Sequence, residues 1–89
     1  MDLVLMLFTG EWCHACKQLS PVVKQVVQEF PDKIELKVVD ISQEPDLATK
    51  YEVLSIPTLI ILQGGQVLEK ITGFISKDKL TGKINSYLK

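Results

Sequence analysis

The stretch "TGEWCHACKQLSP", residues 9–21, holds the only two cysteines of the chain, Cys13 and Cys16, three positions apart. It directly follows an apolar run, residues 3–8, which is typical of a strand buried on both faces in a parallel sheet. Open α/β sheets place their sites at the carboxyl ends of such strands. The position of the two cysteines therefore favours a functional site over a pair of core residues.

A helical pattern begins at the cysteines. Apolar residues recur there with the spacing of one helix face, at Leu19, Val22, Val23, Val26, Val27 and Phe30. Pro31 ends this pattern, because the residue before a proline resists helical geometry. Pro21 lies inside it, where a lost hydrogen bond and a ring clash cost ~3 kcal/mol. We expect a kink at Pro21, with both cysteines on the first segment.

The middle of the chain predicts a second strand and a short helix. Residues 34–41, "IELKVVDI", have the pattern of a second strand that connects back to the first strand through the helix. A strand-helix-strand connection implies a parallel, right-handed pair. Residues 44–53 have the pattern of a short helix with Pro45 near its first turn.

The last third of the chain predicts a hairpin and a final helix. Two apolar runs, residues 58–62 and 67–71, flank Gly64-Gly65 and must be antiparallel. Ser76 is the predicted N-cap of a helix whose apolar face contains Leu80, Ile84, Tyr87 and Leu88. A four-stranded mixed sheet with helices on both faces satisfies this order of elements.

Length and composition limit the possible functions. The 89 residues fit one domain, residues 1–89, and ten basic against eleven acidic residues give a net charge of −1. Without a run of Lys or Arg, nucleic acid is not an expected partner. The opening "MDLVLMLF" lacks the basic residues of a secretory signal and is far shorter than the ~20 residues of a membrane span. We expect a cytoplasmic protein with no membrane partner, and cysteine pairs there are more often catalytic or metal-binding than structural.

Two alternatives to a redox pair stay open. A structural zinc site takes four ligands, and the chain offers two cysteines and His14, whose side chain would point away from the face that the cysteines share. No metal or other cofactor is therefore expected within one chain, although two chains could share a metal. Buried cysteines are also common small core residues.

A redox pair needs the fewest added assumptions. At the first turn of a helix, the Cys13 sulfur would face unpaired backbone N–H groups and the positive end of the helix dipole, which favour the thiolate. The dipole alone supplies about 0.3–1 kcal/mol, so N–H···S contacts or the nearby His14 and Lys17 must add to it. Residues i and i+3 of a helix need only a small adjustment to form a disulfide, and the loop so closed is too short to stabilise the fold much.

The sequence resembles the thioredoxin family. The resemblance rests on WCxxC, the stretch "KYEVLSIPT", a glycine hairpin turn and a later glycine, in register at Trp12, Cys13, Cys16, Pro21, Pro57, Gly65 and Gly73. It extends from about Leu3 to the carboxyl terminus. It implies an α/β thioredoxin fold: a four-stranded mixed sheet of order 2-1-3-4, its last strand antiparallel, flanked by three helices.

The resemblance also implies a function. Cys13 would be the attacking thiolate of a protein-disulfide reductase, and Cys16 the buried thiol that resolves the mixed disulfide. Pro57 would be cis, leaving the Ile56 backbone free to pair with an extended substrate. The rest of the docking surface would consist of Trp12, Gly73 and Phe74. The implied partners are disulfide-containing proteins and a thioredoxin-reductase-like donor, with the chain acting as a monomer in electron transport and cell redox homeostasis.

The sequence departs from the family pattern in three places. Thioredoxins usually carry a further strand and helix before the matched segment, so this chain has the size of a glutaredoxin. Leu7 stands where most thioredoxins have a buried acid that helps the resolving thiol, and His14-Ala15 replaces glycine-proline. One hypothesis is that a partly charged His14 favours the Cys13 thiolate and makes the protein more oxidising; the alternative is an exposed residue of little effect.

Two other functions compete with disulfide reduction by a thioredoxin. One is a glutaredoxin-like protein that uses glutathione, although the usual proline-tyrosine between the cysteines is missing. The other is a non-enzymatic module that binds a metal or a partner protein, with the thiols as ligands or incidental.

Overall fold

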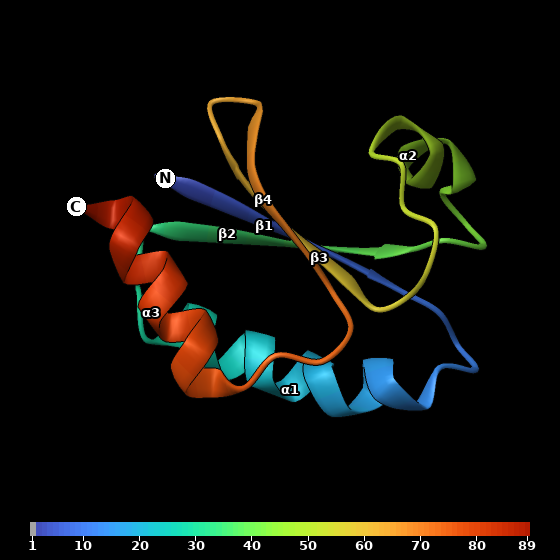
Figure 1. Cartoon of the computed structure of the whole chain (residues 1–89), viewed down its shortest axis with the longest axis horizontal. Helices are drawn as coiled ribbons and strands as arrows, with labels where there is room; N and C mark the ends of the chain where they lie inside the picture. The colour runs from blue at the N-terminus through green and yellow to red at the C-terminus, as the bar shows by residue number, and fades with distance from the viewer. Residues whose placement is uncertain (1) are drawn as a thin grey trace.

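The structure, a computed structural model, describes residues 2–89. Its strands and helices follow the predicted order (Figure 1). They are β1 (Leu3–Thr9), α1 (His14–Gln28), β2 (Ile34–Asp40), α2 (Pro45–Lys50), β3 (Thr58–Gln63), β4 (Gln66–Thr72) and α3 (Lys77–Leu88).

The four strands form one mixed sheet in the order β2-β1-β3-β4, which confirms the predicted topology. β1 is central and runs parallel to β2, with Leu3 beside Ile34. β3 runs antiparallel to β1, and the last strand, β4, runs antiparallel to β3. The sheet therefore ends in the predicted hairpin around Gly64 and Gly65, both of which have positive φ.

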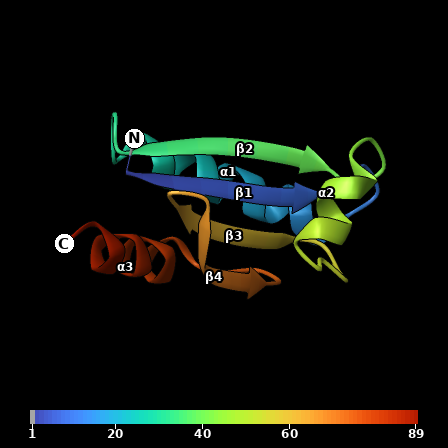
Figure 2. The same cartoon turned by 90° about the horizontal axis from the view of Figure 1, so that it is seen from above.

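The helices cover both faces of the sheet. α1 and α3 lie on one face and α2 on the other (Figures 1 and 2). Leu5 and Leu7 of β1 pack toward α1 and α3, whereas Met6 and Phe8 pack toward α2. Because both faces of β1 are covered, its sequence is a continuous apolar run rather than an alternating one.

Helix α1 places the cysteines. Cys13 is its N-cap residue, with extended backbone, and His14 is the first helical residue. The buried face of the helix contains Cys16, Leu19, Val23 and Val26. The helix continues through Pro21 as one element, with Pro21 on its exposed side; the kink expected there stays a prediction.

A Schellman motif ends α2. The Val53 N–H donates to the Ala48 carbonyl at 2.8 Å, and the Glu52 N–H donates to the Thr49 carbonyl at 3.1 Å. Glu52 has φ +54°, in the left-handed region where such motifs usually carry glycine. The motif turns the chain toward Ile56 and Pro57.

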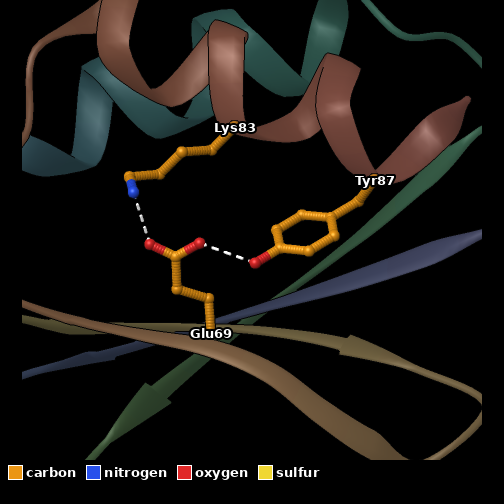
Figure 3. A network of polar contacts seen from close by, with 3 residues as sticks. All are labelled: Glu69, Lys83 and Tyr87. Carbon is orange, nitrogen blue, oxygen red and sulfur yellow. Dashed lines mark hydrogen bonds and ion pairs between the residues drawn. The ribbon is translucent and has the colours of Figure 1, made fainter.

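Polar side chains connect β4 to α3. The Ser76 hydroxyl caps α3 as predicted, accepting from the Lys79 N–H at 3.3 Å. Farther along the helix, the Glu69 carboxylate accepts from Lys83 Nζ and, at 2.7 Å, from the Tyr87 hydroxyl (Figure 3). These contacts hold α3 against the edge strand of the sheet.

Candidate functional site

The two cysteines form a disulfide at the amino end of α1, just beyond the carboxyl end of β1. Their Cα atoms lie 5.2 Å apart. Cys13 Sγ accepts a hydrogen bond from the Cys16 backbone N–H at 3.1 Å. Cys16 is 2% exposed, whereas Cys13 is partly exposed. The site thus contains one accessible and one buried sulfur, with a helix N–H directed at the accessible one.

Three of the residues next to the cysteines, Trp12, His14 and Lys17, are exposed. Trp12 is 91% exposed, so it is not a core aromatic. His14 and Lys17 are exposed on the first turn of α1, and the His14 ring lies 3.4 Å from the Gln18 side-chain amide. The Lys17 backbone N–H donates to the Cys13 carbonyl at 3.2 Å.

Two loops from elsewhere in the chain meet at Pro57. The Ile56–Pro57 peptide bond is cis, as predicted. The Pro57 carbonyl accepts from the Gly73 N–H at 2.9 Å, and Gly73 has φ +87°, which favours glycine. Phe74 follows it and is 54% exposed. The structure therefore joins the predicted residues Pro57 and Gly73 by a direct hydrogen bond.

Gly10 connects the β1–α1 turn to the same place. A Cβ atom at Gly10 would lie 2.6 Å from Ile56 Cδ1, so the Ile56 side chain packs against residue 10 only because that residue lacks a side chain. Ile56 thereby lies against the turn that leads into Cys13.

The comparisons with known proteins agree with this geometry. The family model for thioredoxin matches residues 1–86. The chain is 39% identical over 85 residues to thioredoxin of Bacillus subtilis (strain 168), a match that spans 96% of this chain and 82% of that protein. The chain belongs to the thioredoxin family. A thioredoxin of Staphylococcus aureus is 36% identical over 84 residues, covering 94% of this chain and 81% of its own length.

Solved thioredoxin structures share the fold. A mutant thioredoxin from Halobacterium salinarum NRC-1 superposes with a TM-score of 0.90 at 31% identity, over 99% of this chain and 76% of that one. A structure described as thioredoxin-2, a component of malaria parasite protein secretion machinery, gives a TM-score of 0.91 at 28% identity, over 96% of this chain and 82% of that one.

Family membership and the cysteine pair together show the reaction class. The chain is a thiol-disulfide oxidoreductase, a protein-disulfide reductase of the thioredoxin type. This interpretation is favoured over the glutaredoxin-like and the non-enzymatic alternatives. Membership implies disulfide-containing substrates and a reductase that donates electrons.

Leu7 marks a difference from the usual thioredoxin pattern. It is 1% exposed and belongs to the apolar cluster between the sheet and helices α1 and α3. Leu7 of this chain is therefore a packing residue.

Sequence reasoning did not identify two residues near the site. Leu54 is 97% exposed in the loop before Ile56, and Lys70 of β4 bonds the backbone of the same loop. The sequence did offer a signal for Leu54, because it is an apolar residue that belongs to no predicted helix face and no predicted strand. For Lys70 the sequence carries no signal, because the contact joins residues 18 and 19 positions apart.

Within residues 2–89 there is no group of three or more His, Cys, Asp or Glu side chains suited to a metal ion. No helix in the same range is long and apolar enough to span a membrane.

Proposed function

We propose that Cys13 is the attacking thiolate and Cys16 the resolving thiol. The observation that carries this assignment is the bond from the Cys16 N–H to Cys13 Sγ, on the more exposed of the two sulfurs. A backbone donor at a helix N-terminus stabilises a thiolate relative to a thiol. Cys16 would act only after the mixed disulfide has formed, by attacking Cys13 Sγ.

The proposed cycle transfers two electrons. The Cys13 thiolate attacks one sulfur of the substrate disulfide, which breaks, and the released substrate thiolate takes a proton. The Cys16 thiolate then attacks Cys13 Sγ in the mixed disulfide and releases the second substrate thiol. The product is the Cys13–Cys16 disulfide present in the structure. A dithiol donor returns the two electrons by the same exchange.

We assign the docking of substrate to the surface around the cysteines. Its proposed members are Trp12, Ile56, Pro57, Gly73 and Phe74. The exposure of Trp12 and Phe74 supports this, as does the hydrogen bond between Gly73 and Pro57. An extended substrate segment would add to the Ile56 backbone as a short strand.

His14 and Lys17 are proposed to tune the redox potential. Both lie on the first turn of α1, where positive charge adds to the field of the helix terminus at the Cys13 sulfur. Their exposure limits the size of the effect, because water screens exposed charges.

We further propose that residues 1–89 act as one domain and as a monomer, since every proposed site residue comes from one chain. A cytoplasmic setting fits a pair that must be re-reduced, because that compartment keeps thiols reduced. The electrons would come from a thioredoxin-reductase-like donor. The protein would thus serve electron transport and cell redox homeostasis, without nucleic acid or membrane as partner.

The deciding experiment is reduction of insulin disulfides by dithiothreitol in the presence of catalytic amounts of the protein. The proposal expects activity that Cys13→Ser abolishes, and expects Cys16→Ser to form a stable mixed disulfide with the substrate. If Cys13→Ser formed a stable mixed disulfide through Cys16, and Cys16→Ser formed none through Cys13, the assignment would be reversed. Activity with glutathione as sole reductant would instead support a glutaredoxin-like cycle.

A second experiment would identify the electron donor. It measures the potential of the Cys13–Cys16 couple and tests which reductase system reduces the disulfide.

A further inference from the structure

Lys70 of β4 holds the loop that precedes Pro57. Its Nζ atom donates to the Tyr51 carbonyl at 2.9 Å and to the Glu52 carbonyl at 2.5 Å. Lys70 pairs with Ile60 across the hairpin, and Ile60 belongs to the apolar cluster on the α2 face. The lysine side chain therefore reaches the end of α2 from the edge strand of the sheet.

The Lys70 ammonium group can stabilise the carboxyl end of α2. Carbonyl oxygens at a helix C-terminus lack helical partners and carry partial negative charge. Here the C-cap is Tyr51, and the next residue, Glu52, has φ +54°, a strained conformation for any residue other than glycine. Lys70 bonds the carbonyls of these two residues, so it stabilises the turn where the backbone is strained.

The loop from that turn to Pro57, residues 51–57, is here called the docking loop. Two further bonds fix its far end. The hydroxyl of buried Thr58 donates to the Ser55 carbonyl at 2.7 Å, and the Gly73 N–H donates to the Pro57 carbonyl. Lys70 supplies the anchor at the near end. Between these anchors Leu54 projects almost fully into solvent.

We propose that Lys70 is a positioning residue for substrate proteins, which fixes the docking loop so that Leu54 and Ile56 meet an incoming polypeptide in a single orientation. The inference rests on the proposed docking of substrate at Ile56 and Pro57. A loop that is already ordered loses less conformational entropy when it binds. A small disulfide that contacts only the sulfurs gains nothing from this order.

The test compares Lys70→Met, which removes the donors, with Lys70→Arg, which keeps a cation that can bond two carbonyls. Lys37→Met is the matched control, since Lys37 is an exposed lysine on β2, the opposite edge strand. Each variant is assayed for kcat and KM with insulin, using dithiothreitol as reductant. Pre-reduced protein is also reacted with the small disulfide 5,5′-dithiobis(2-nitrobenzoic acid), and the Cys13–Cys16 potential is measured.

The expected result for Lys70→Met is a KM for insulin raised by about threefold to tenfold, with kcat and the potential unchanged and the small-disulfide rate within about twofold. Lys70→Arg should restore KM, and Lys37→Met should match the unmodified protein. An unchanged KM in Lys70→Met, an equal loss with the small disulfide, or no rescue by arginine would overturn the inference. Failure of the unmodified protein to reduce insulin would instead refute the proposed function, so the two failures are distinguishable.

Discussion

The Cys16 backbone N–H donates to the Cys13 sulfur at 3.1 Å. The residue that caps α1 therefore also contributes the more exposed sulfur of the disulfide. Reduction breaks the S–S bond but leaves this donor in the helix backbone. The reduced Cys13 sulfur therefore keeps a hydrogen-bond donor that favours its charged form.

Alkylation of the reduced protein should be selective for Cys13. With iodoacetamide at neutral pH, we expect Cys13 to be modified and Cys16 to be protected by burial. At this pH Cys13 should react faster than a free cysteine does. Mass spectrometry of peptides identifies the modified residue, with Cys13→Ser as the control for Cys16 reactivity. Equal modification of both cysteines would contradict the proposed roles.

The His14 hypothesis predicts a change in redox potential. His14→Gly should make the Cys13–Cys16 couple more reducing by about 6–20 mV, if the residue contributes about 0.3–1 kcal/mol to the reduced form. Equilibration with a glutathione buffer measures this shift, and Lys17→Met tests the second proposed tuning residue in the same way. A potential unchanged by His14→Gly would end the hypothesis.

The Glu69 network should contribute to stability. Glu69→Gln removes the charge that bonds Lys83 and Tyr87, and should lower the free energy of unfolding by about 0.5–1 kcal/mol, discounted for partial exposure. Thermal unfolding would show a Tm lower by about 2–8 °C. Glu29→Gln is the matched control, because Glu29 forms a more exposed ion pair with Lys77 and should have a smaller effect. A larger loss in the control would argue against the network.

The same network predicts how stability depends on pH. Hydrogen bonds from Lys83 and Tyr87 hold the pKa of Glu69 below its ordinary value of 4.5. Its contribution is complete above the unfolded-state pKa and is lost as pH falls through the lower folded value. The bond to Glu69 raises the pKa of Tyr87 above its ordinary 10.0, so that contribution is complete below about 10 and is lost as pH rises through the folded value. Urea unfolding at a series of pH values should show both losses diminished in Glu69→Gln.

Asp32 offers a test of backbone strain away from the site. It has φ +64° in a turn where the Lys33 N–H donates to the Phe30 carbonyl at 3.1 Å and Pro31 precedes it, as in a type II turn. Asp32→Gly should raise the free energy of unfolding by about 0.5–1 kcal/mol. Relief of backbone strain stabilises the folded state, and the greater flexibility of glycine in the unfolded chain offsets part of that gain. Asp32→Ala should lower it, because alanine tolerates this conformation less well than aspartate. Chemical denaturation measures both; a less stable glycine variant would contradict the argument.

Local patterns predicted most of the fold. The helix-face spacing that starts at Leu19 and the cap at Ser76 depend on neighbouring residues, and the structure bears both out, although α1 ends at Gln28, two residues before Phe30. The residues that the resemblance aligned with Pro57 and Gly73 are in direct contact. The sequence did not assign the direction of β3 relative to β1, which depends on how the chain returns after α2.

Contacts between distant residues could not be predicted in this way. Glu52 adopts a conformation that sequence patterns associate with glycine, so its turn gave no local signal. The hydrogen bonds from Lys70 to the end of α2 form only because the hairpin brings β4 to that helix end. Local sequence alone does not decide the exposure of Trp12, because a tryptophan beside a cysteine pair can pack inward or face solvent; in the structure it faces solvent.

The alternation of side chains along β4 has a consequence for how the molecule opens. Glu69 and Lys70 are neighbours on an edge strand, yet one bonds α3 and the other bonds the docking loop on the opposite face. Transient separation of β4 from β3 would release α3 and the docking loop together. The periphery of the protein would then exchange its amide hydrogens as one cooperative unit, while β1 and the sulfur-bearing turn stay closed.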